Sequence, residues 1–93
     1  MDESKVDMDG HPPIVRSSGF KHGLTADQIR AAAQTPALGR PYETESGVLI
    51  EVHFLPSDGR PIELGYAESD ELGSVLIHAN FLTKAVRRRA QLP

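Results

Sequence analysis

Four side chains in the second half of the chain carry groups suited to proton transfer or anion binding: His53, Arg60, Glu63 and His78. Histidine titrates near neutral pH, so His53 or His78 could act as a general base or a general acid. A carboxylate beside His53 would orient the ring and favour its protonated form, which is the role expected for Glu63. Arg60 could hold a phosphate. The alternative is structural: His53 and Glu63 form a cross-strand pair that only stabilises a hairpin, and His78 is a half-buried strand residue.

Two stretches of alternating apolar residues position His53 and Glu63 in the chain. Residues 48–55 and 62–67 each alternate with period two, which predicts two half-buried strands joined by a tight turn. A three-residue loop, residues 57–59, keeps one face of this hairpin apolar, whereas a two-residue loop mixes the faces. In the three-residue register His53 faces Glu63 on the side away from the core, with Cβ atoms about 4.5–5.5 Å apart. The sequence therefore predicts a His–Glu pair displayed on the outer face of the sheet.

Basic side chains elsewhere are candidates for binding an anion. Lys21 and His22 come just before an expected helix start, and a helix N-terminus favours negative charge. Lys84, Arg87 and Arg88 lie on an expected C-terminal helix. The alternatives are a structural histidine in a turn and a solvated helix face. The four histidines show no helical or zinc-finger spacing, so no metal site is predicted.

A helix is expected to begin at Thr25. Thr25 and Gln28 form the spacing of a capping box, and the helix must stop before Pro36. Leu24 before the cap completes the pattern of a hydrophobic staple. The buried side of this helix is predicted to comprise Ile29, Ala32 and Ala33.

The remaining elements complete an α+β pattern. Residues 75–79 predict a third strand, residues 42–44 an additional strand, and residues 14–15 a short edge strand. A last helix is expected over residues 83–91, with an apolar stripe repeating every four residues. The expected fold is a small antiparallel sheet of three to four strands with an N-terminal and a C-terminal helix.

Composition places these elements in one small domain. The chain has 93 residues, a net charge of −3 and no cysteine. Residues 1–18 are polar, acidic and proline-containing, so we expect a loosely ordered tail that contributes little to folding, followed by a domain over residues 19–93. A core this small is often supported by a homodimer or a bound partner. The chain contains no long apolar run, so we expect a cytoplasmic protein without membrane contact.

Several short motifs, taken in order, resemble the BrnT toxin family. Residues 21–28 (KHGLTADQ) resemble the family's K-H-G helix start, and the T-P that follows fits the family's helix end. Residues 59–66 (GRPIELGY) resemble a G-R-hydrophobic strand ending in tyrosine. Residues 77–89 resemble the family's closing I-S-A-R, T and R-R motifs. The resemblance covers residues 19–92.

The resemblance implies a RelE-like fold and a bacterial toxin of a type II toxin–antitoxin pair. Such toxins are endoribonucleases that cleave RNA without a metal or other cofactor, and a DNA-binding antitoxin protein neutralises them. In that reading His53, Glu63, Arg60 and His78 are the catalytic candidates. RNA or an acidic segment of the antitoxin would contact the basic candidates named above.

Two positions depart from the family pattern. Asn80 stands where the family has the arginine of I-S-A-R, and Ser46 stands where an arginine leads into the long strand. Two expected phosphate-binding arginines are thus absent, and the charge outside the tail is nearly neutral. These departures keep two alternatives open: a catalytically silent protein-binding module of the same fold, and a stand-alone phage or host accessory protein.

Overall fold

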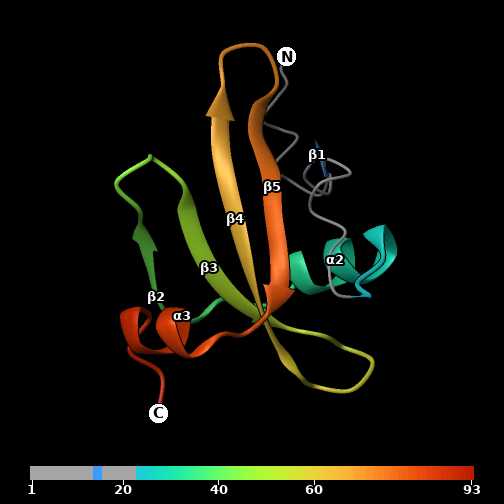
Figure 1. Ribbon diagram of the computed structural model, residues 1–93. Coiled ribbons are helices and arrows are strands. Elements are labelled where there is room, and N and C mark those ends of the chain that lie inside the picture. The colour runs from blue at the N-terminus through green and yellow to red at the C-terminus, as the bar shows by residue number, and fades with distance from the viewer. Residues whose placement is uncertain (1–13, 16–22) are drawn as a thin grey trace.

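The computed structural model describes residues 14–15 and 23–93. Its strands form one sheet in the order β1-β5-β4-β3-β2 (Figure 1). The strands are β1 (Ile14–Val15), β2 (Leu38–Glu43), β3 (Leu49–Phe54), β4 (Pro61–Ser69) and β5 (Gly73–Phe81), and the helices are α2 (Ala26–Ala33) and α3 (Lys84–Arg89). Strands β2 to β5 pair in antiparallel fashion, whereas β1 is parallel to β5. The predicted α+β class, with a helix before and a helix after the antiparallel strands, is confirmed.

Helix α2 begins at the predicted capping box. Gln28 N donates to Thr25 Oγ1 at 3.1 Å, and Thr25 N donates to Gln28 Oε1 at 2.9 Å. Two otherwise unpaired donors at the helix N-terminus are thereby satisfied. Ile29 and Ala32 are buried, as predicted, and Ala33 is half-buried. The helix ends ahead of Pro36, which disfavours helical backbone in the residue before it.

The register of the β3–β4 hairpin differs by one residue from the prediction. His53 lies opposite Ile62, and Glu63 lies opposite Val52. The connection is a four-residue loop, residues 56–59, closed by backbone hydrogen bonds of its flanking residues. The predicted three-residue loop is wrong, and so is the predicted pairing of His53 with Glu63. The reason is that both faces of this hairpin bury apolar side chains, so keeping one face apolar did not select the register.

The two helices contact opposite faces of the sheet. On the α2 face lies the main core, which comprises Leu24, Ile29, Ala32, Leu55, Ile62, Leu64, Leu76 and Ala79. The other face, which we call the α3 face, includes buried Val52 and Ile50. Tyr42 lies opposite Ile50 on this face, and the Arg89 guanidinium of α3 stacks 4.5 Å from the Tyr42 ring centre. Glu63 lies opposite Val52 and is therefore on the α3 face. His53 lies opposite Ile62 of the main core and is therefore on the α2 face.

A β-bulge interrupts the β4–β5 ladder. Gly65 lies opposite His78, but the next pair is Tyr66 with Leu76, so Ile77 is an extra residue. The bulge places Leu76 on the α2 face with Ala79, and this explains the continuous apolar run of the predicted third strand. That strand is confirmed and is longer than expected.

The strand predicted at residues 14–15 is also confirmed, at the β5 edge of the sheet. The other expectations for residues 1–18 lie outside the described residues. Strand β2 confirms the additional strand expected at residues 42–44 and begins earlier, at Leu38. In the described part of the chain, no helix has the length and apolar character needed to cross a bilayer.

Candidate functional site

One buried carboxylate connects a half-exposed histidine to the start of α3. His78 Nε2 donates to Glu63 Oε2 at 2.8 Å. The other oxygen, Glu63 Oε1, accepts from the backbone N and the hydroxyl of Thr83, each at 2.8 Å. The Glu63 side chain is 5% exposed and the His78 side chain is 35% exposed. The carboxylate is therefore shielded from solvent, while the imidazole is accessible.

Thr83 gives this connection its rigidity. It is the N-cap of α3, and its hydroxyl oxygen accepts from Val86 N at 3.4 Å while donating to Glu63. The Thr83 hydroxyl group is thus hydrogen-bonded both to the first turn of α3 and to the Glu63 carboxylate. Because β4, β5 and α3 each contribute one side chain, the site forms only when all three elements are in place.

The surroundings of Glu63 keep it ionised. Burial alone would raise the pKa of Glu63, but the hydrogen bonds from His78 and from Thr83 outweigh this, and the pKa lies below its ordinary value. An ionised Glu63 holds the proton of His78 on Nε2. In a neutral ring the lone pair is then on Nδ1, which is the arrangement that a general base requires.

His53, unlike His78, is buried and bridges two parts of the fold. Its side chain is 4% exposed, Nδ1 donates to the Thr35 carbonyl oxygen at 2.8 Å, and Nε2 contacts Glu51 Oε1 at 2.8 Å. Each ring nitrogen thus has its own oxygen partner. The ring fixes the segment after α2 to β3. This geometry fits the structural alternative, with Glu51 rather than Glu63 as the partner.

Arg60 directly follows the hairpin loop and lies on the α2 side, opposite Leu55. Its Nε donates to Asp58 Oδ2 at 2.8 Å, and its guanidinium stacks 4.4 Å from the ring centre of Phe81, which packs against the main core. The backbone hydrogen bond from Arg60 N is the largest cause of a lowered pKa of Asp58. Of the four predicted catalytic side chains, the structure therefore brings together only Glu63 and His78.

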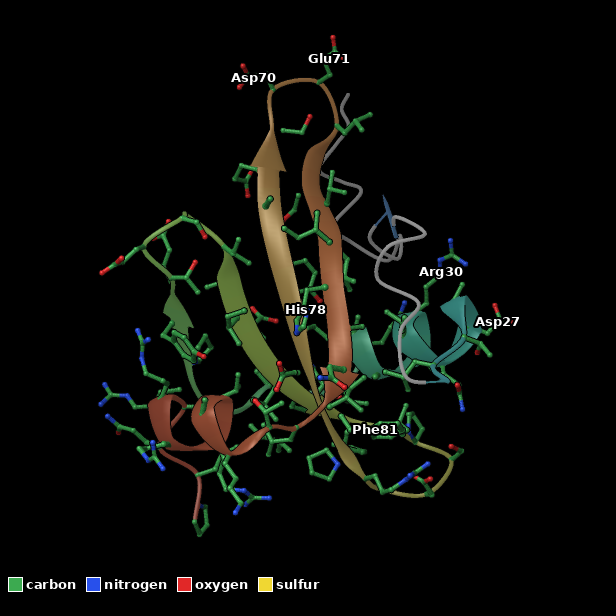
Figure 2. All side chains as sticks on the ribbon, viewed as in Figure 1. Asp27, Arg30, Asp70, Glu71, His78 and Phe81 are labelled. Atoms are coloured by element: carbon green, nitrogen blue, oxygen red, sulfur yellow. The ribbon has the colours of Figure 1, made fainter. Side chains whose placement is uncertain are left out.

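Basic side chains gather at the α3 end of the molecule. We call this cluster the basic end; its members are exposed and comprise Arg40, Lys84, Arg87, Arg88 and Arg89. Figure 2 shows nitrogen-tipped side chains around α3, whereas Asp70 and Glu71 lie at the opposite end of the sheet. Within the described residues the acidic partners of the ion pairs are Glu51, Asp58 and Glu63, and none of them pairs with the basic end. Arg87 Nη1 donates to the Pro93 backbone oxygen at 2.6 Å. The predicted pair Arg87 and Arg88 is thus part of a larger cationic surface.

Sequence reasoning missed Thr83 as a member of the site. Thr83 could have been recognised from its position before a basic amphipathic helix, where threonine is a common N-cap. Asn80, the position that departs from the family pattern, lies opposite Glu63 on the α3 face. Lys21 and His22 lie outside the described residues. No group of three or more metal-binding side chains occurs within residues 23–93.

The chain was compared with protein-family models, with curated proteins and with solved structures, and none of the three comparisons finds a match.

Proposed function

We propose that the protein is a BrnT-like toxin, a metal-independent endoribonuclease that an antitoxin protein neutralises. The observation that carries the proposal is the half-exposed His78, held by buried Glu63 at the start of a helix that belongs to the basic end. Cleavage of a phosphodiester without a metal requires a proton acceptor together with cations that bind the phosphate.

In this proposal His78 Nδ1 takes the proton of a ribose 2′-hydroxyl. The 2′-oxygen then bonds to the adjacent phosphorus, the bond from phosphorus to the 5′-oxygen breaks, and that oxygen takes its proton from the imidazolium. The products are a 2′,3′-cyclic phosphate and a 5′-hydroxyl end. Glu63 stabilises the transient imidazolium, as a carboxylate does for a catalytic histidine in general.

The basic end supplies the cations that the chain lacks at Asn80 and Ser46. Arg88 and Lys84 are exposed on α3 and are the candidates for the scissile or flanking phosphates. In this proposal the antitoxin neutralises the enzyme by covering the same surface with an acidic segment. RNA and antitoxin then compete for one site.

Induced expression in a bacterial host tests the activity. Wild-type protein should arrest growth and fragment cellular RNA, and His78→Ala should abolish both effects at equal protein level. Arg30→Ala is the matched control, because Arg30 lies on α2, away from the basic end (Figure 2). Normal growth and intact RNA at high wild-type expression would overturn the proposed activity.

A protein-binding module of the same fold is the second candidate. It is favoured by the full engagement of Glu63, whose two oxygens already hold His78 and Thr83 in place. In that case the pair is an anchor for α3, and the basic end binds an acidic protein segment without chemistry. The expression experiment separates the two, because only the ribonuclease fragments RNA.

A further inference from the structure

We infer that Gly65 is a positioning residue for His78: the missing side chain at this position leaves the space in which the imidazole reaches Glu63. Gly65 is buried in the middle of β4, directly opposite His78 on β5 and opposite Ile50 on β3. Its backbone does not adopt the left-handed conformation that favours glycine. Conformational need therefore does not explain a glycine here, and a central strand position is a costly place for one.

Space explains the glycine. A Cβ added at Gly65 would lie 3.1 Å from His78 Cβ, 3.1 Å from Val48 Cγ1 and 3.3 Å from Ile50 Cδ1. All three distances are shorter than ordinary van der Waals contacts between carbon atoms. One methyl group at this position would therefore push on His78 Cβ, Val48 and Ile50, and these neighbours would have to shift by a few tenths of an ångström to accommodate it.

The direction of the His78 side chain shows why this space matters. Glu63 is not directly opposite His78; its opposite residue is Asn80, so the His78–Glu63 hydrogen bond runs diagonally across the two strands. Diagonal neighbours are farther apart than direct ones, and only a side chain that leans along the strand joins them. The β-bulge at Ile77 immediately precedes His78, and bulges commonly redirect the neighbouring side chain. Bulge and glycine together set the direction of the ring.

The consequence for catalysis rests on the proposed ribonuclease activity, whereas the positioning itself does not. Gly65→Ala should displace His78 and weaken its hydrogen bond to Glu63, leaving the Thr83 bonds in place. The pKa of Glu63 should then rise toward its ordinary value, because one of the hydrogen bonds that lower it is lost. RNA cleavage should fall roughly 10- to 100-fold, the usual consequence of a small displacement of a catalytic group.

The test measures the pKa of Glu63 by NMR through its side-chain carboxyl carbon, together with RNA cleavage, in the full-length protein. Gly65→Ala should raise this pKa, and Ala67→Ser, on the same face of β4, should not. In a His78→Ala background Gly65→Ala should add nothing to either measurement, because its effect acts through the ring. An unchanged Glu63 pKa in folded Gly65→Ala, or an additive effect in the His78→Ala background, would overturn the inference.

Val48→Ala provides the rescue, since it removes one of the atoms that would trap the new methyl group. In the double variant Gly65→Ala with Val48→Ala, the pKa of Glu63 should return part of the way to its wild-type value. The cleavage rate should also return part of the way to that of the wild type. If Gly65→Ala alone does not fold, the double variant should fold and carries the measurement; failure of both to fold would assign Gly65 to sheet packing and overturn the inference. A raised Glu63 pKa in Gly65→Ala, with no cleavage by the wild type, would refute the ribonuclease while the positioning role stands.

Discussion

Glu63 and His78 meet diagonally across β4 and β5 with 2.8 Å between Oε2 and Nε2, and the same carboxylate holds the first turn of α3 through Thr83. His53 lies on the other face of the sheet, buried against the segment that follows α2. The two histidines therefore have different surroundings. The His53 ring is buried and bridges two parts of the fold, whereas the His78 ring is half-exposed.

Glu63→Gln should reduce stability in a pH-dependent manner. A folded-state pKa below the ordinary carboxyl value means that ionised Glu63 stabilises the fold above the unfolded-state pKa, and that this contribution is lost as pH falls through the folded-state pKa. At neutral pH the variant should lose about 1.5–3 kcal/mol of unfolding free energy, the scale of hydrogen bonds to a charged group. Urea denaturation of both proteins, from neutral pH into the acidic range, measures this difference in unfolding free energy.

The difference between wild type and Glu63→Gln should shrink as pH falls below the ordinary carboxyl range. Glu68→Gln is the control, because Glu68 is an exposed residue of the same strand. A difference that stays constant from neutral pH into the acidic range would mean that the charge of Glu63 does not support the fold.

His53→Ala should destabilise the protein far more than His78→Ala. Removing the buried ring leaves the Glu51 carboxylate and the Thr35 carbonyl without their partner and also leaves a cavity, with an expected cost of about 2–4 kcal/mol. His78 is half-exposed, so water can replace part of its interaction, and about 1 kcal/mol is expected. Equal losses in urea denaturation would contradict the assignment of the two histidines to different roles.

Gly39 and Gly59 should respond differently to alanine, although both have a left-handed backbone. At Gly59 an added Cβ meets no atom, so only the conformational cost of roughly 1–2 kcal/mol applies. At Gly39 the Cβ would collide with the Ala90 carbonyl oxygen and the Leu92 side chain, which fasten the end of the chain to β2. Gly39→Ala should therefore cost at least about 1 kcal/mol more than Gly59→Ala.

The backbone N of Arg40 donates to the Ala90 carbonyl oxygen at 2.8 Å. In Gly39→Ala the loss of unfolding free energy should be accompanied by faster hydrogen exchange of the Arg40 amide. The same exchange rate should be unaffected in Gly59→Ala. Equal unfolding free energies of the two variants would show that the chain end is not fastened through Gly39.

Local signals predicted the elements well, because each depends on neighbouring residues alone. The capping box at Thr25, the strands before and after the hairpin, and the C-terminal helix are all found in the structure. These features required no knowledge of which face each strand buries.

The register and the partner of Glu63 depend on which face each strand buries, and both were predicted wrongly. Glu63 is a charged residue on a buried surface, satisfied by His78 and Thr83 from distant parts of the chain. Alternation of apolar and polar residues predicts that such a charged residue faces solvent. The predicted hairpin register depends on that assumption. The bulge at Ile77 and the α3 contact with the sheet are likewise tertiary features, so the partner of Glu63 was misassigned.

The proposed ribonuclease activity is measured by incubating purified protein with a single-stranded RNA oligonucleotide in the presence of a metal chelator. The account predicts 2′,3′-cyclic phosphate ends with wild-type protein and a loss of about 100-fold or more in His78→Ala, the scale of general acid–base catalysis. Arg60→Ala should cleave at nearly the wild-type rate, because Arg60 lies on the α2 side, paired with Asp58. Absence of cleavage by folded wild-type protein, or undiminished cleavage by His78→Ala, would contradict the account.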